Sequence, residues 1–196
     1  MSSAYGVVYP LWSFHGDTDN RLARLIGEVG VDHITVPVVT GPVVDFRAAP
    51  TAGPHHFETQ GGWHFQPERE HYHTNEVKPK SADWLRTRNP LPQLVELARK
   101  RDLQVHFRVD LPAAFLSAPG HETCAVRNMW DEQVPIAGPC TLHPDYRAMF
   151  RGTVEDLLTY APDGFEFFVD KVVDDRWSRA RPARPQTDLD ASCFDL

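Results

Sequence analysis

Cysteine is scarce in this chain and never paired in sequence. The three cysteines, Cys124, Cys140 and Cys193, lie far apart among 196 residues, and none belongs to a CxxC motif. A disulfide framework needs several closely placed cysteines, and a zinc ribbon needs two CxxC pairs. Neither is expected here.

Long apolar runs and an excess of positive charge are also absent. No apolar stretch approaches the about 20 residues that span a bilayer. Lysine and arginine number 20 against 27 acidic residues, giving a net charge of −7. The arginines within 176–184 are interrupted by prolines and flanked by aspartates. Nucleic acids and anionic membranes are therefore not expected partners. The first residues lack a basic segment leading into an apolar one, so we expect a cytoplasmic protein.

Several nucleotide and hydrolase motifs are missing as well. The sequence contains no P-loop, no G-x-G-x-x-G and no G-x-S-x-G. A nucleotide cradle and a serine-hydrolase elbow therefore have no support.

What is present is a regular alternation of apolar strands and amphipathic helices. We expect strands at 5–12, 31–39, 104–110 and 164–170. Helices are expected from Asp17 or Thr18 to Gly30, from Asn89 and Pro90 to 101, and from 143–145 to Tyr160. This order is typical of an α/β protein of parallel βα units, with right-handed crossovers.

The connections are strongly asymmetric in length. Residues 40–88 and 111–143 follow strands, whereas the helix-to-strand connections are only a few residues long. Long insertions at the carboxyl ends of parallel strands are where α/β enzymes place binding loops. We expect one domain over residues 1–170, and we interpret 171–196 as an irregular tail or the start of a further half.

One part of the chain resembles a known family. Its three segments are Pro139-Cys-Thr-Leu-His-Pro-Asp-Tyr-Arg-Ala-Met-Phe, Val154-Glu-Asp-Leu-Leu and Asp163-Gly-Phe. They resemble the third-helix-to-fourth-strand region of glycoside-hydrolase-like TIM barrels related to the α-amylase superfamily. The likeness extends over about residues 5–170 but is specific only in 139–170. It implies a (β/α)8-type barrel, with Asp170 where related glycosidases keep a catalytic carboxylate.

Such a barrel normally needs about 250 residues, and this sequence provides four βα units. It also lacks the second carboxylate that a later strand would supply. We therefore expect the amino-terminal half of a longer protein, a homodimer in which two halves combine, or a degenerate relative. The expected ligand is a carbohydrate.

Asp170 and Asp110 are the candidate catalytic residues. Glycosidases need two carboxyls about 5–5.5 Å apart for retention or about 6.5–9.5 Å for inversion. Neighbouring strands lie about 4.8 Å apart, so the ends of strands three and four fit either spacing. In the alternative interpretation both aspartates cap loops or pair with arginine. Similarly, His106 and Arg108 either bind substrate or form a polar network with Glu166.

Aromatic and histidine residues supply the remaining candidates. The expected substrate-binding residues are Trp12, His15, Trp63, His64 and Tyr72. The segment 53–73 is rich in histidine, and His71-Tyr72-His73 with neighbouring acids also fits a metal site. No firm ligand spacing accompanies it, so we expect no cofactor. Two other functions stay open: a metal-dependent sugar isomerase or endonuclease-like barrel, and a non-catalytic carbohydrate-binding protein.

Overall fold

The structure is a computed structural model that describes residues 5–14, 17–49, 53–85, 89–116, 118–134 and 138–168. Two predicted site residues, His15 and Asp170, lie outside the described residues, as does the segment 171–196. Among the described residues, no helix combines the length and the apolar character needed to cross a membrane.

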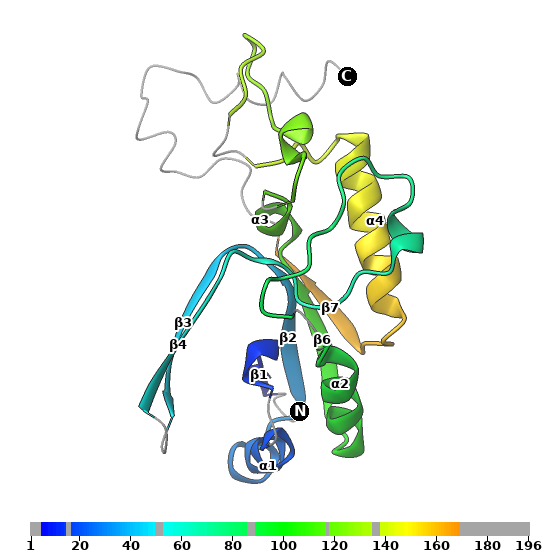
Figure 1. The fold of residues 1–196 in the computed structure, drawn as a ribbon. Helices are drawn as coiled ribbons and strands as arrows, with labels where there is room; N and C mark the ends of the chain where they lie inside the picture. The colour runs from blue at the N-terminus through cyan, green and yellow to red at the C-terminus, as the bar shows by residue number, and fades with distance from the viewer. Residues whose placement is uncertain are drawn as a thin grey trace.

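A parallel sheet forms the centre of the fold (Figure 1). Its strands are β1 (Gly6–Val8), β2 (His33–Thr40), β6 (Gln104–Val109) and β7 (Gly164–Phe167), in that spatial order. Each neighbouring pair is parallel. The predicted α/β class with parallel βα units is therefore confirmed, and strand order follows chain order as in a partial barrel.

The first predicted strand, 5–12, is much longer than the observed one, and the predicted end of the last strand at 169–170 lies outside the described residues. β1 ends at Val8, and Leu11–Ser13 forms a 3-10 turn instead of continuing the strand. Pro10 immediately precedes this turn, and a proline has no N–H to donate to a sheet ladder. β7 is described as a strand only over Gly164–Phe167.

The helices begin at the predicted capping residues. α1 (Thr18–Arg24) continues as a π-helical segment over Leu25–Val29 and ends at Gly30, whose φ of 74° lies in the left-handed region. α2 (Leu91–Lys100) starts after Asn89, whose side chain accepts a hydrogen bond from the Leu91 N–H. α4 (Pro144–Leu158) has His143 as its N-cap. Proline in the first turn and basic residues in the last turn of α2 explain these limits.

The segment 40–88 is not the plain loop that the sequence indicated. It contains an antiparallel hairpin of β3 (Val43–Ala49) and β4 (Gly53–Thr59), which stands away from the main sheet in Figure 1. The chain then returns through β5 (Gly62–Trp63), which pairs antiparallel with the end of β2. This return needs glycine, because Gly62 has a φ of 115°.

The second insertion, 111–143, also has local structure. It begins with α3 (Leu111–Phe115), followed by a 3-10 turn at His121–Cys124. Isolated bridges join Ala125 to Pro139 and Arg127 to Gln133. These contacts return the chain to the start of α4 on the side of the sheet where the strands end (Figure 1).

The two faces of the main sheet differ in character. Along β6, buried Val105, Phe107 and Val109 alternate with the more exposed Gln104, His106 and Arg108. The apolar face packs against α2 and α4 in one core, which includes Leu94, Ala98, Met149 and Leu157. The opposite face, which would line the lumen of a closed barrel, is therefore left polar.

Candidate functional site

Polar side chains of three neighbouring strands form what we call the sheet-face cluster: His33, Thr35, His106, Arg108 and Glu166. β2 supplies the first two, β6 the next two and β7 the last. The strand register places Thr35 opposite His106 and Arg108 opposite Glu166. Because parallel strands carry alternate side chains to one face, these residues gather without any help from loops.

Glu166 is the most heavily bonded member of the cluster. Arg108 donates from Nε and Nη2 to Glu166 Oε2 at 3.0 and 2.8 Å, and the Thr35 hydroxyl donates to Oε1 at 2.6 Å. The Thr35 hydrogen bond, together with Arg108 and against the opposing effect of partial burial, lowers the pKa of Glu166. Glu166 is therefore an ionised acceptor at neutral pH and is unsuited to act as a general acid.

Two histidines extend this cluster toward the start of the strands. The rings of His33 and His106 stack with centroids 4.9 Å apart. Glycines beside them provide the space: a Cβ at Gly6 would lie 1.9 Å from His33 Nε2, and one at Gly164 would lie 3.1 Å from His106 Cδ2. The polar face is therefore packed closely around the two rings. Of the expected network, the Arg108–Glu166 ion pair is present, with 34% and 38% of the two side chains exposed, while His106 joins the cluster through its stacking on His33.

Four rings form a second group, the aromatic cluster, composed of Trp12, Phe57, His64 and Trp84. Trp12 stacks on Phe57 with centroids 4.9 Å apart and planes 4° from parallel. The ring centroid of His64 lies 5.2 Å from that of Trp12 and 5.9 Å from that of Trp84. The cluster joins the β3–β4 hairpin to the carboxyl ends of β1 and β2. Trp12, Phe57 and Trp84 are each partly exposed.

Hydrogen bonds fix the orientation of this cluster. Trp12 Nε1 donates to Asp45 Oδ2 at 2.8 Å, and Trp84 Nε1 donates to His64 Nδ1 at 2.9 Å. Since Nδ1 must accept, the neutral His64 ring carries its proton on Nε2, which lies 2.7 Å from the Thr40 hydroxyl. Burial lowers the pKa of His64 to about 4, so the ring is neutral at pH 7.

The predicted site residues have different fates. Trp12 and His64 are brought together in the aromatic cluster, and His106 and Arg108 in the sheet-face cluster. Trp63, His64 and Tyr72 are buried, at 0%, 0% and 2% exposure, so the predicted direct contact of these three side chains with a substrate is wrong, whereas Trp12 is partly exposed. Trp63 instead donates from Nε1 to the buried Thr153 hydroxyl at 3.1 Å. The sequence could not show this, because aromatic residues of an insertion are equally common in a core and at a binding surface.

Asp110, which follows β6, is the N-cap of α3. Its carboxylate accepts from the Ala113 N–H at 3.3 Å and caps α3, while its own N–H donates to Val39 O. This agrees with the capping interpretation of Asp110. Capping leaves the carboxylate at the carboxyl end of the strand, where barrel enzymes place their catalytic groups.

Sequence reasoning missed five contributors: His33, Thr35, Asp45, Phe57 and Trp84. His33 and Thr35 were detectable in principle, because both fall on the same face of their strand. Phe57 and Trp84 come from the long insertion, whose path back to β2 no local pattern reveals. The alternative metal site of His71, His73 and neighbouring acids is only partly assembled, because His73 Nδ1 lies 2.6 Å from the Glu70 carbonyl oxygen. His71 instead lies beside the exposed Glu68 and Glu70.

Comparison with known proteins identifies the fold. No protein-family profile and no curated protein matches the sequence. Among solved structures, a noncanonic maltogenic alpha-amylase from Thermotoga neapolitana is similar, with a TM-score of 0.54 and 14% sequence identity. The match covers 91% of this chain and 42% of that one, so the chain spans less than half the length of the amylase. At this identity the likeness shows the fold alone: a partial barrel of parallel βα units, as the resemblance implied.

Proposed function

We propose that this protein binds a carbohydrate at the carboxyl ends of β1 and β2, with Trp12 as the main contact. The observation that carries the proposal is the aromatic cluster, in which a partly exposed indole is held flat by Phe57 and fixed at Nε1 by Asp45. A rigid ring offers an apolar face for a pyranose, and binding sites combine such faces with a few oriented polar groups.

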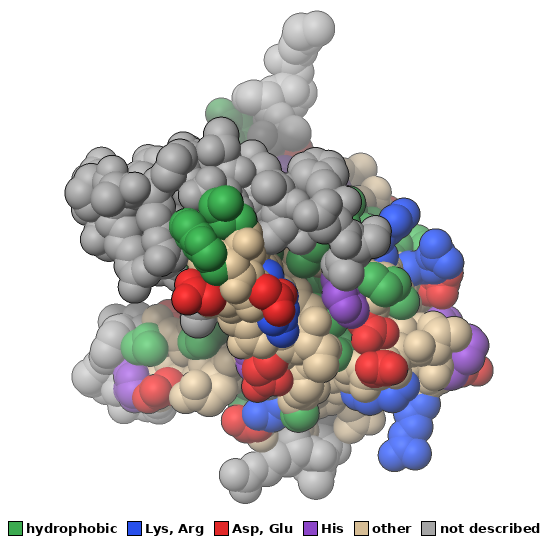
Figure 2. All heavy atoms as spheres, turned by 90° about the horizontal axis from the view of Figure 1, so that it is seen from above, with side chains coloured by type: hydrophobic (Ala, Val, Ile, Leu, Met, Phe, Trp, Pro, Cys, Tyr) green, Lys and Arg blue, Asp and Glu red, His purple; other side chains and the backbone are tan. Residues whose placement is uncertain are grey.

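The position and charge of this side of the molecule support the proposal. Barrels of this type bind their ligands at the carboxyl ends of the strands. Figure 2 looks onto that side and shows acidic, basic and histidine side chains intermixed among the described residues. Mixed charge suits a neutral polyhydroxy ligand better than a polyanion. From the sheet-face cluster, Arg108 and Glu166 add polar groups near the same end of β6 and β7.

Binding is tested with maltooligosaccharides, because the structural neighbour is a maltogenic α-amylase. Calorimetric titration of wild-type protein should give saturable binding, and Trp12→Ala should weaken it at least about tenfold, or about 1.4 kcal/mol. Trp130→Ala is the matched control, since Trp130 is 53% exposed in the other insertion. Trp12→Phe keeps an aromatic face and should keep most of the affinity. If Trp12→Ala folds and binds maltooligosaccharides like wild type, the proposed site is wrong. If the wild-type protein binds no glycan, the proposed function is wrong.

We propose that the bound glycan is hydrolysed by Asp170, with Asp110 as the second carboxylate. Asp110 ends β6, and Asp170 follows the described end of β7, the neighbouring strand. Release of reducing ends from the bound glycan should stop in Asp170→Asn and persist in Asp174→Asn. Binding should survive in both variants. A chain that binds glycan but never cleaves it would be a binding protein, and the catalytic assignment would be dropped.

We also propose that the sheet is completed by a second copy or by further chain. Among the described residues β7 has a strand neighbour on one side only, and Phe167 and Phe168 are 43% and 54% exposed. An unpaired edge beside apolar side chains favours association. Light scattering after size exclusion should show a dimer of this chain, whereas a stable monomer at micromolar concentration would contradict the dimer.

A further inference from the structure

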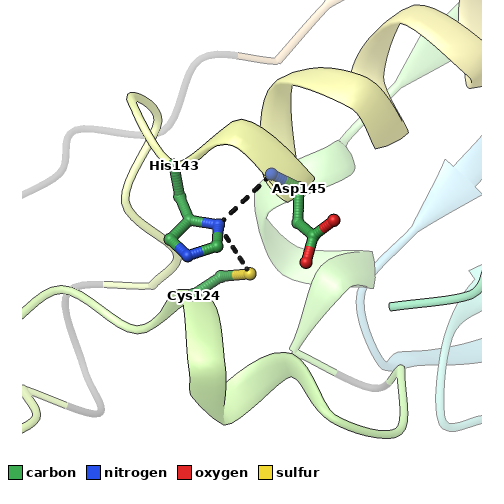
Figure 3. Close-up of side chains that lie close together, drawn as sticks. All are labelled: Cys124, His143 and Asp145. Atoms are coloured by element: carbon green, nitrogen blue, oxygen red, sulfur yellow. Dashed lines mark hydrogen bonds between the residues drawn. The ribbon is translucent and has the colours of Figure 1, made fainter. Parts of the chain in front are cut away.

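Three metal-ligating side chains converge at the start of α4, outside both clusters described above. Cys124 closes the 3-10 turn at His121–Cys124, His143 is the N-cap of α4, and Asp145 lies in its first turn. Figure 3 shows the thiol and the imidazole pointing at each other with the carboxylate beside them. One ligand atom from each residue lies within 4.8 Å of the others. The group is assembled by the fold, since 18 residues separate Cys124 from His143.

The distances are close to those of an occupied site. Cys124 Sγ lies 3.2 Å from His143 Nδ1. Tetrahedral zinc, with Zn–S of about 2.3 Å and Zn–N of about 2.0–2.1 Å, holds sulfur and nitrogen about 3.6 Å apart. The sulfur and the nitrogen therefore need to separate by only a few tenths of an ångström. The Asp145 N–H, which donates to Nδ1 at a long 3.3 Å, would give way to the ion.

Hydrogen bonds outside the group hold the three residues in place. The Cys140 N–H donates to the Cys124 carbonyl at 2.7 Å, and the His143 N–H donates to the Cys140 carbonyl at 3.1 Å. The Glu76 N–H donates to Asp145 Oδ1 at 3.1 Å, which orients that carboxylate. Partners of this kind around metal ligands fix their geometry and raise affinity. Part of the entropic cost of ordering the ligands is therefore already met by the fold.

The donor set selects the class of metal. A thiolate, an imidazole and a carboxylate together favour a borderline-soft divalent ion over calcium or magnesium, which take oxygen ligands. We propose that Cys124, His143 and Asp145 bind one zinc ion. On binding, the Cys124 thiol releases its proton to solvent, and the thiolate, the imidazole nitrogen and one carboxylate oxygen coordinate the ion. Three protein ligands leave the fourth position to water, as in zinc sites that perform chemistry.

Another cluster of metal-ligating type among the described residues serves as an internal comparison. Glu68, Glu70 and His71 also bring three ligand atoms together, but both glutamates are exposed and no sulfur is present. In contrast, Cys124 is buried and His143 is partly buried. Buried ligands lose less order and less hydration when an ion enters. The site at the start of α4 therefore binds zinc more tightly than this exposed cluster.

The test uses the whole chain, reduced and freed of metal, titrated with Co²⁺ and then with Zn²⁺. Wild-type protein should bind one Co²⁺ per chain and show a thiolate-to-cobalt charge-transfer band. Addition of zinc should abolish this band. Cys124→Ser should lose the band, and His143→Gln and Asp145→Asn should each weaken cobalt binding at least about tenfold. Cys140→Ser is the matched control, because it removes the other buried thiol of the described residues and should keep the band.

Two measurements on the unchanged protein keep the proposal falsifiable if a variant fails to fold. Zinc should raise the melting temperature of the wild-type chain in a concentration-dependent way. It should also slow alkylation of Cys124, identified by peptide mass spectrometry, relative to Cys193. A wild-type protein without a charge-transfer band overturns the proposal. So does a band that survives in folded Cys124→Ser, or one that disappears in folded Cys140→Ser.

Discussion

The buried His64 should make the stability of this protein fall between pH 7 and pH 5. Its side chain is fully inaccessible, and burial lowers its pKa from the ordinary 6.5 to about 4. The unfolded chain therefore binds a proton on this residue below about pH 6.5, whereas the folded chain does so only near pH 4. Unfolding takes up a proton between these values, so stability falls as pH falls through this window.

The size of the effect follows from the two pKa values. One pKa unit corresponds to about 1.36 kcal/mol, so the full shift amounts to about 3.4 kcal/mol once pH is below both values. At pH 5 about 2 kcal/mol of this has been lost, and at pH 7 almost none. The cause is specific: Trp84 donates to Nδ1, the neutral ring presents Nε2 to Thr40, and no water reaches the ring.

Urea unfolding at pH 7, 6 and 5, followed by tryptophan fluorescence, measures this effect. The informative quantity is the change in unfolding free energy from pH 7 to pH 5, compared between wild type and His64→Gln. The variant loses hydrogen bonds and is less stable throughout, but its pH-dependent loss should be about 2 kcal/mol smaller. His73→Gln, at an exposed histidine, is the control and should behave like wild type. If His64→Gln keeps the wild-type pH dependence, the reasoning is refuted.

Three further predictions concern packing and the sheet-face cluster. Gly62→Ala should destabilise the protein by at least about 3 kcal/mol in urea unfolding, because a Cβ there would lie 2.4 Å from the Lys80 carbonyl oxygen at a φ of 115°. Gly120→Ala is the control, because Gly120 has a φ of 82° but open space around it, and it should lower the free energy of unfolding by roughly 1 kcal/mol. Similar losses in the two variants would show that the Gly62 site has no steric clash. A double-mutant cycle of Arg108→Met and Glu166→Gln in urea unfolding should give a coupling free energy of about 1 kcal/mol, because the pair is partly exposed. A coupling of zero would show that this ion pair does not contribute to stability. Phe107→Ala should cost about 3–5 kcal/mol at this fully buried position, and a loss below 1 kcal/mol would contradict the assigned core.

The predictable part of the fold is the part governed by periodicity. The strands at β2 and β6 and the helices α2 and α4 were located from apolar spacing and capping residues, and the structure confirms their order. A polar network of Arg108 with Glu166 is one of the two interpretations that the sequence allows, and the ion pair between them follows from the parallel register. By contrast, the hairpin at β3 and β4 was taken for a loop, because prolines, glycines and histidines interrupt its pattern.

The candidate sites follow the same division. Residue type and position near strand ends point to Trp12, Trp63, His64 and Tyr72 alike, yet only Trp12 of these four keeps exposed surface. Nothing local distinguishes it from the other three. The return of the chain through β5 buries Trp63 and places the buried His64 ring against Trp12.

Parallel βα units and long segments at the strand ends can be predicted from the amino-acid sequence. The strands and helices depend on periods of 2 and 3.6 residues, which act between near neighbours. Three sets of contacts become visible only in the folded chain: Phe57 supports Trp12, Trp84 and Thr40 fix His64, and Cys124 meets His143 and Asp145. Most of those contacts join residues that lie about 20 or more positions apart in the sequence. They depend on how each insertion folds back, which no local periodicity encodes.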